Sequence, residues 1–413
     1  MIQLFAALAF ATGSQQPPPV RSVAGDELTV YLLTFDPGGL VWERFGHNAL
    51  WIRDKGTGLD IAYDYGRFTF GSTPGDVLRF AGRFAAADMR YSMGEADALR
   101  TLAAYRQAGR SIWAQELDLP PAARVALRDF LVWNAKEENR YYQYHYYLDN
   151  CSTRLRDAID RVVGGQLKTW AQSITTPWTY RDQTRRTTEN SPTTYTLLML
   201  GLGQPVDRPL TAWEEMFLPI SLRPYLNQLE VVDPDGRRHP IVKTERHLVE
   251  NSLYSVSDRP SPWILRYLVV GVGFGGMLLG LGRLGRRSLG GRWGFGAAAV
   301  GWATVTGLGG VVLAALWAFS AHRFSYWNEN LLQLNLGALA LAFVLPGAIW
   351  RSQSRYRQGV RLAAVVAAIS AMGLALKVVP GMDQANFDMI ALILPIHAGV
   401  WLGLGALGAG PSS

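Results

Sequence analysis

The chain has 413 residues, of which 49% are hydrophobic and 18% charged, and its formal net charge is +7. That length allows two or three domains. Two short segments hold eight arginines and no acidic residue, and subtracting these eight charges leaves the rest of the chain at −1. The basic pI therefore gives no support for nucleic acid as a partner. The eight are Arg283, Arg286, Arg287, Arg292, Arg351, Arg355, Arg357 and Arg361.

The first residues predict a secretory signal peptide. Residues 1–11 form an apolar run, which is followed by small residues and a Gln- and Pro-rich stretch. Such a run is too short to span a bilayer, which takes ~20 residues. We therefore expect a cleaved signal over residues 1–19. Because no Lys or Arg precedes the run, a mis-assigned start or a retained anchor is the alternative.

Residues 20–260 have the pattern of a water-soluble α+β domain. Runs rich in β-formers, separated by Gly- and Asp-rich turns, predict strands, and the runs on either side of 54–58 predict a hairpin. Apolar residues at helical spacing predict helices, one of them stopped by Gly164-Gly165. The predicted strands are 28–35, 47–52 and 60–66, a later hairpin joins 229–232 to 239–242, and the predicted helices start at Thr73 and cover 93–108, 123–140 and 152–163.

The remaining residues, 261–413, predict an all-α bundle of five transmembrane helices. Each apolar run is long enough to cross the hydrocarbon core. The arginine-rich segments join spans one to two and three to four, so they share a side, which the positive-inside rule makes cytoplasmic. We therefore expect an inner-membrane protein whose soluble domain faces the periplasm. The predicted spans are 263–282, 294–319, 331–350, 360–379 and 389–409.

Cys151 is the only cysteine and directly precedes a predicted helix. A cysteine attacks as its thiolate, and the positive end of a helix dipole favours that anion. Asn150 is a good capping residue, and its amide could also donate to an oxyanion. These features predict a nucleophile at Cys151. The alternative is a packed residue at the start of a helix.

A cysteine nucleophile needs a base, and His47 is the strongest candidate among six histidines. It follows Gly46 and begins a predicted strand, which would hold its ring rigidly. The alternative is an edge-strand histidine without catalytic function. The hairpin turn near Gly56 sets the end of the next strand opposite His47, so we predict Asp64 as the group that orients the imidazole, with Asp60 and Tyr63 as competitors.

Other polar and aromatic residues are candidates for binding substrate. An aromatic run that precedes Cys151 is of a kind that favours a membrane interface, although ordinary packing explains it as well. The loop between spans two and three is external, polar and aromatic, and could contact a lipid head group or simply cap a span. The candidates are Tyr63, Tyr147, Asn150, His322, Asn328 and Asn330. No cluster of His, Cys and carboxylates has the spacing of metal ligands, and no cofactor is predicted.

The order of these motifs resembles a known arrangement. A histidine in GHNALWI, a polar group on the next strand and a later DNCSTRL resemble the circularly permuted papain-like fold of lecithin:retinol acyltransferase and its phospholipid-acyltransferase relatives. The whole chain after the signal resembles the Lnb-type bacterial lipoprotein N-acyltransferases, which join such a domain to several transmembrane helices. Further matching segments are YDYGRFTF, WEEMFLPISL from Trp213 and HRFSYWNENLLQLN from His322.

This resemblance implies a reaction and its partners. The protein would move an acyl chain from a membrane phospholipid to the amine of a lipoprotein's diacylglyceryl cysteine. Cys151 would form the thioester and His47 would act as the base. Both substrates are anchored in the membrane, which fits an active site held at its surface by a helical bundle.

Two other functions use the same residues differently. A membrane-tethered cysteine amidase or peptidase acting on cell-wall peptides would employ the same Cys-His pair, but it needs one anchor and not five spans. A lipid-binding or scaffold protein would need no chemistry from Cys151 at all.

Overall fold

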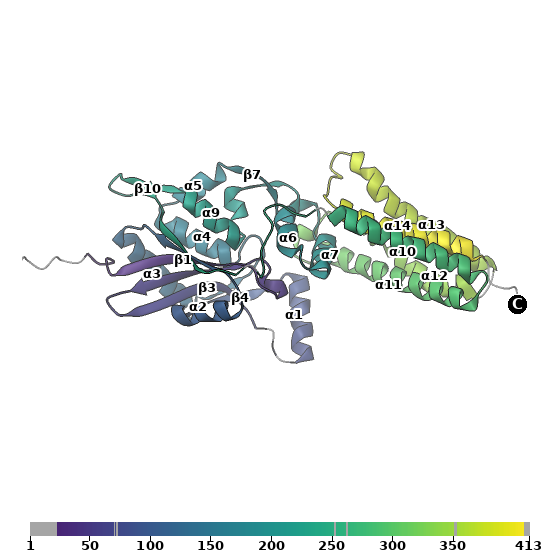
Figure 1. The fold of residues 1–413 in the computed structure, drawn as a ribbon, viewed down its shortest axis with the longest axis horizontal. Helices are drawn as coiled ribbons and strands as arrows, with labels where there is room; N and C mark the ends of the chain where they lie inside the picture. The colour runs from purple at the N-terminus through teal and green to yellow at the C-terminus, as the bar shows by residue number, and fades with distance from the viewer. Residues whose placement is uncertain are drawn as a thin grey trace, which may run out of the picture.

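A computed structural model describes residues 23–408, except 70, 72, 252, 262, 351 and 352. The predicted signal peptide lies outside these residues. The molecule is elongated, with a domain of strands and helices at one end and a bundle of long helices at the other (Figure 1). The predicted combination of an α+β region with five apolar helices is confirmed.

A seven-stranded sheet organises the external domain, and every pair of neighbouring strands in it is antiparallel. The predicted hairpin is formed by β2 and β3, in which Ala49 pairs with Asp64. A smaller hairpin of β9 (Glu230–Val232) and β10 (Arg238–Pro240) confirms the turn at 235–236. In spatial order the sheet contains β11 (Val242–Val249), β5 (Ile112–Leu117), β1 (Leu28–Phe35), β2 (His47–Asp54), β3 (Leu59–Arg67), β4 (Arg90–Asp97) and β6 (Tyr141–Gln143).

Helices cover both faces of this sheet. One face packs against α3, α4 and α9, and its core includes Leu50, Leu155 and Leu222. The other face packs against α2, around Ala49 and Ala98. The helices of this domain are α1 (Pro74–Ala86), α2 (Ala98–Gln107), α3 (Pro121–Ala135), α4 (Cys151–Val162), α5 (Gln166–Gln172), α6 (Tyr180–Thr188), α7 (Pro192–Gly201), α8 (Ala212–Glu215) and α9 (Pro219–Gln228).

The prediction of a helix over 93–108 was partly wrong. Residues 93–97 belong to β4, which pairs with β3 and β6, and the helix begins only at Ala98. The Asp97 side chain accepts a hydrogen bond from the Arg100 backbone and so caps α2. Tertiary pairing of β4 with its two neighbours overrides the local helical pattern.

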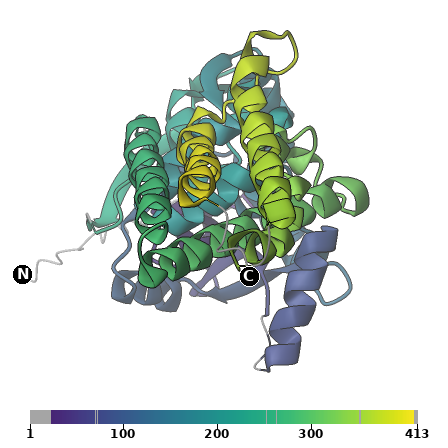
Figure 2. The ribbon, with the colours of Figure 1, turned by 90° about the vertical axis from the view of Figure 1, so that its right-hand side faces the viewer.

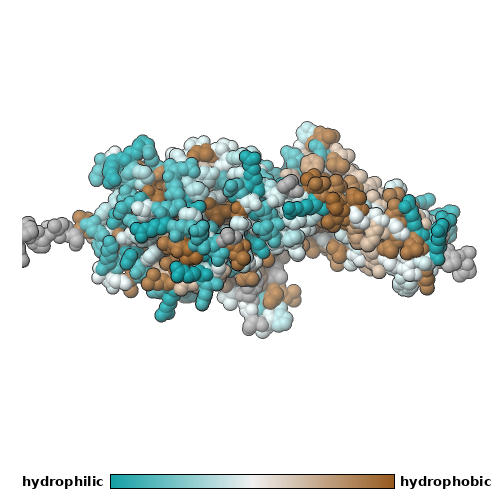
Figure 3. All heavy atoms as spheres, viewed as in Figure 1, coloured by the Kyte–Doolittle hydropathy of each residue, from teal (hydrophilic) through white to brown (hydrophobic). Residues whose placement is uncertain are grey.

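The bundle contains five candidate spans, each long and apolar enough to cross a membrane. The third, Glu329–Trp350, includes the 3-10 helix Glu329–Leu332 as well as α12, which has 15 residues. The last residues of α10 and α12 lie at the end of the bundle far from the external domain (Figure 1), which is the side predicted to be cytoplasmic. The surface changes from mostly hydrophilic on the external domain to mostly hydrophobic along the bundle (Figure 3). The helices are α10 (Trp263–Gly285), α11 (Leu289–Phe319), α12 (Leu336–Trp350), α13 (Gln353–Ala375) and α14 (Phe387–Leu407).

Hydrogen bonds join the external domain to the outer loops of the bundle. The amides of Asn328 and Asn330 donate to the carbonyls of Leu200 (2.8 Å) and Met199 (2.9 Å) at the end of α7. Gln384, in the loop before α14, donates to the Leu202 carbonyl at 3.0 Å. The domain is therefore fixed on the bundle through directional contacts.

Candidate active site

Cys151 is the first residue of α4, and Asn150 caps that helix. The Asn150 side-chain oxygen accepts from the backbone amides of Ser152 (2.9 Å) and Thr153 (3.0 Å). Its side-chain nitrogen donates to the carbonyls of Tyr146 (2.9 Å) and Phe217 (3.0 Å). These four hydrogen bonds use the amide fully, so they favour a structural role for Asn150 over the predicted contact with substrate.

A distant segment fixes the same end of α4. The backbone carbonyl of Met216 accepts from the Ser152 hydroxyl at 2.7 Å, and that of Trp213 accepts from Arg156 at 2.6 Å. The Phe217 carbonyl makes a third such contact, so the WEEMFLPISL segment that starts at Trp213 binds the start of α4 through three backbone carbonyls. It holds the helix start that presents Cys151.

The structure brings His47 and Asp64 together. His47 Nε2 lies 3.2 Å from Asp64 Oδ2, and the two side chains are 17% and 20% exposed. Asp64 pairs with Ala49, which lies two residues after His47 on β2. Because side chains alternate with a period of two, Asp64 and His47 lie on the same face of the sheet. A contact through Nε2 leaves Nδ1 for a partner on the other side of the ring.

Cys151 approaches this end of the sheet beside Gly66. Gly66 has φ +93°, and a Cβ built there would lie 3.6 Å from the Cys151 Cβ and 4.0 Å from the Tyr144 ring. A residue with a longer side chain would occupy the space between strand β3 and the thiol. Gly66 thus allows Cys151 to lie close to the sheet.

The electrostatic environment favours the charged form of His47. Burial acts to lower its pKa. Charge interactions with Tyr105 and Cys151 act to raise it, as do side-chain hydrogen bonds to Asp64 and Cys151. The net result is a His47 pKa well above its usual value. An imidazolium between a carboxylate and a sulfur atom is the state expected of a cysteine–histidine pair.

Two residues that the sequence did not identify support this arrangement. Arg67 Nε donates to Asp64 Oδ1 at 2.6 Å and so fixes the carboxylate. Arg67 passes over Gly94, where an added Cβ would lie 2.2 Å from its guanidinium carbon. Asp64 lies three residues before Arg67 on the same strand, and Gly94 lies on the neighbouring strand β4. The spacing from Asp64 is the local signal that could have identified this arginine.

Arg110 is the second residue that the sequence did not identify. Its side chain is 4% exposed, and its Nε donates to the Asp36 carbonyl at 2.7 Å. Its guanidinium lies 4.7 Å from the centre of the Tyr105 ring. Burial lowers the Arg110 pKa, while charge interactions with Tyr105, Glu43 and Cys151 act to raise it. A buried positive charge therefore lies within electrostatic range of the thiol.

Tyr63 and Tyr147 are packed side chains. Tyr63 is 4% exposed and belongs to the core beneath α4, on the face of β3 opposite Asp64. Tyr147 is 4% exposed, stacks on Tyr180 at 4.4 Å and hydrogen-bonds Thr184 at 2.6 Å. These contacts favour structural roles for both tyrosines.

The three predicted residues of the outer loop bind the protein itself. Asn328 and Asn330 are 2% and 0% exposed and hold α7, as described above. His322 is 7% exposed, and its Nε2 contacts the Phe84 carbonyl of α1. Their geometry favours docking of the domain over contact with a lipid head group.

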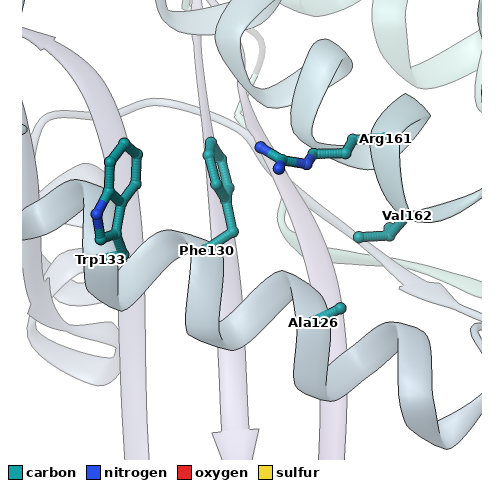
Figure 4. A pocket seen from close by; sticks show the side chains of 5 residues that line it. All are labelled: Ala126, Phe130, Trp133, Arg161 and Val162. Carbon is teal, nitrogen blue, oxygen red and sulfur yellow. The ribbon is translucent and has the colours of Figure 1, made fainter.

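A pocket of about 540 Å³ lies away from the thiol. Ala126, Phe130 and Trp133 of α3 face Arg161 and Val162 at the C-terminal end of α4 (Figure 4). Cys151 is at the other end of this 12-residue helix, which is ~18 Å long. The pocket is therefore not part of the cysteine–histidine site. In the described part of the chain, no group of three His, Cys, Asp or Glu could hold a metal ion.

Comparison with known proteins places the site in a family domain. Residues 15–186 match the family model described as the Lnb N-terminal periplasmic domain. No curated protein and no solved structure matches the chain. The matched range includes His47, Asp64 and Cys151. With the five apolar helices, this match supports an inner-membrane protein with a periplasmic domain of the Lnb type.

Proposed function

We propose that the protein is a cysteine-dependent lipoprotein N-acyltransferase. It takes a fatty acyl chain from a membrane phospholipid, holds it as a thioester on Cys151 and transfers it to the N-terminal amine of a diacylglyceryl-cysteine lipoprotein. The observation that carries this proposal is the position of His47, which contacts Asp64 and interacts with Cys151 in a domain fixed on a five-helix bundle. The match to the Lnb domain supports the same reaction class.

In the first half-reaction, the Cys151 thiolate attacks the ester carbonyl of the phospholipid. A C–S bond forms, the ester C–O bond breaks, and the His47 imidazolium gives its proton to the departing lysophospholipid oxygen. The oxyanion needs a hydrogen-bond donor near the start of α4. The backbone amides of Ser152 and Thr153 already donate to Asn150, so we assign the backbone N–H of Cys151 as that donor. The charge of Arg110 favours the thiolate before attack.

In the second half-reaction, the lipoprotein amine attacks the thioester. A C–N bond forms, the C–S bond breaks, and His47 accepts the amine proton, which restores the imidazolium–thiolate pair. Asp64 orients the ring and stabilises its positive charge throughout, and Arg67 holds Asp64 in place. We also infer that the external domain is a permuted papain-like fold, because a cysteine at a helix start interacts with a histidine at the start of a strand of an antiparallel sheet.

Mass spectrometry of a lipoprotein N-terminus tests this proposal in cells that depend on the protein. With wild-type protein we expect N-acylated lipoproteins. A Cys151→Ala variant, at equal abundance in the membrane, should leave the amine free. Asp60→Asn is the matched control and should retain N-acylation. N-acylated lipoprotein in the Cys151→Ala strain would contradict the proposal, and release of cell-wall peptides by the purified wild type would favour the amidase alternative.

A further inference from the structure

Helix α1 (Pro74–Ala86) projects from the external domain with an exposed apolar side. Val77, Leu78 and Phe84 are 53%, 76% and 47% exposed. At about 100° per residue they fall on one side of the helix with Phe80, and Arg79 and Arg83 fall on the other. These two arginines pair with Asp76 at 3.1 Å and with Asp88 at 3.3 Å. Such a distribution is typical of helices that lie in a membrane interface.

The position of α1 fits that interface. The Phe84 carbonyl contacts His322, and their rings are 5.1 Å apart. His322 follows the outer end of α11, so α1 lies at the outer boundary of the bundle. Two perpendicular views show α1 crossing the direction of the bundle helices, roughly parallel to the membrane plane (Figures 1 and 2). Hydrophobic side chains are visible on this projection (Figure 3).

Exposed aromatic residues mark the same boundary on the bundle. Phe319, the last residue of α11, is 88% exposed, and Trp327 is 65% exposed. Trp327 packs against Trp317 at a ring distance of 5.3 Å. Aromatic rings concentrate at membrane–water interfaces. The apolar side of α1 therefore adjoins the end of the bundle at which these aromatic residues are exposed.

A row of aromatic rings connects α1 with Cys151. Phe80 packs on Phe68 (5.9 Å), Phe68 on Tyr91 (4.9 Å) and Tyr91 on Tyr144 (4.2 Å). Tyr144 and the Cys151 Cβ both border Gly66. At the outer end, Trp42 contacts Phe68 edge-on at 6.1 Å and is 51% exposed. The row thus begins at the predicted bilayer surface and ends at the thiol.

We propose that α1 lies in the outer-leaflet interface with its apolar side inserted, and that the aromatic row guides a phospholipid acyl chain from the bilayer to Cys151. The bilayer is the expected occupant because α1 adjoins the spanning helices and runs parallel to the membrane plane. A 13-residue helix is too short to span a membrane itself. The guiding role rests on the proposed acyl transfer, whereas the insertion of α1 does not.

Fluorescence quenching tests the insertion. The experiment uses the full chain with Cys151→Ser, which removes the only native cysteine. A single new cysteine is then introduced and labelled with an environment-sensitive dye. The labelled protein is reconstituted in phosphatidylethanolamine–phosphatidylglycerol vesicles. Dye at Leu78→Cys should be quenched by shallow spin-labelled lipid and shielded from iodide. Two control positions are Arg79→Cys, on the opposite side of α1, and Leu99→Cys, exposed on α2. Dye at either position should be quenched by iodide and not by spin-labelled lipid. Iodide quenching at residue 78 equal to that at residue 99 would overturn the proposal, and so would protection that requires another protein.

Acylation kinetics test the guiding role. The Leu78→Asp variant should acylate Cys151 roughly tenfold more slowly from vesicle phospholipid, because a carboxylate opposes insertion. Its acylation by water-soluble p-nitrophenyl butyrate should be unchanged. Leu99→Asp is the control and should match the wild type with both donors. Equal loss with both donors, or no loss with vesicles, would overturn the guiding role. If the wild type accepts neither donor, the proposed acyl transfer itself fails, while the quenching result still decides where α1 lies.

Discussion

At the scale of single residues, the site depends on one carboxylate that holds one imidazole. Asp64 contacts His47 at 3.2 Å and is itself bound by Arg67 at 2.6 Å. Asp60 lies on the same strand with nearly the same exposure, 22% against 20%, but it binds Trp51 and Arg53. The difference between these two aspartates is therefore one of position and not of burial.

This difference predicts the effect of two matched substitutions. Asp64→Asn should lower the rate of Cys151 acylation by about 10²-fold, because the amide no longer stabilises the imidazolium or fixes its orientation. Asp60→Asn, which keeps an oxygen for Trp51, should change the rate less than about threefold. Intact-mass analysis after mixing with p-nitrophenyl butyrate measures both rates. Similar losses in the two variants would exclude a specific role for Asp64.

His145 gives a prediction of pH dependence. Its Nδ1 accepts from the backbone amides of Tyr147 (3.2 Å) and Leu148 (3.3 Å), which requires an unprotonated nitrogen. Burial, together with charge interactions with Arg323 and His322, lowers its pKa from 6.5 to about 4. Between these values the unfolded chain binds a proton that the folded chain does not, so folding stability falls as the pH falls.

The matched variant for this effect is His145→Gln, which cannot titrate. From pH 7 to pH 4.5 the wild type should lose on the order of 2 kcal/mol more unfolding free energy than the variant. Thermal unfolding in detergent at both pH values measures this difference. Equal losses in wild type and variant would mean that His145 binds a proton in the folded protein.

Local patterns in the sequence predicted Cys151, His47 and Asp64 as site residues, and the structure brings His47 and Asp64 into contact. A capping residue before a helix and a strand that starts after a glycine are local signals. The position of the hairpin turn predicted correctly that Asp64, at the end of the second strand, lies beside His47. Arg110 binds the carbonyl of Asp36, 74 residues earlier in the chain, and no local pattern encodes that contact. Arg67 lies three residues after Asp64, and this spacing could have identified it.

At the scale of elements, close packing of α10 on α14 depends on glycines. A Cβ at Gly275 would lie 2.3 Å from the Pro395 carbonyl oxygen, and one at Gly271 would lie 2.5 Å from that of Leu392. Small residues that recur along a membrane helix allow backbones to approach closely. The apolar runs predicted both helices, but they could not show which glycines form the contact.

Two alanine substitutions in the same helix distinguish the contact glycines from the others. Gly275→Ala should destabilise the bundle by about 2 kcal/mol, because the added methyl group meets backbone that cannot move freely. Gly273 has nothing within 4 Å of an added Cβ. Gly273→Ala should therefore leave stability unchanged or raise it by up to about 1 kcal/mol. Thermal unfolding in detergent measures both, and equal effects would contradict the packing described for α10 and α14.

At the scale of the whole molecule, the external domain and the bundle form one unit. Buried polar contacts join them, including Arg185 with Asp388 at 3.3 Å and the Tyr195 hydroxyl with Asp388 at 2.8 Å. The sequence predicted an external loop of uncertain purpose at 320–330. Its asparagines bind carbonyls of α7, and such a role could not be predicted because carbonyl acceptors leave no trace in the sequence. Docking of this kind holds Cys151 at a constant position relative to the membrane surface.

The central claim is that Cys151 carries the acyl group during transfer. Intact-mass analysis of the full chain after incubation with phospholipid vesicles, without a lipoprotein acceptor, tests it most directly. The account predicts an added mass of one fatty acyl group on the wild type, removed by neutral hydroxylamine and absent from Cys151→Ala. An unmodified wild-type protein, or an adduct that persists in Cys151→Ala, would contradict it.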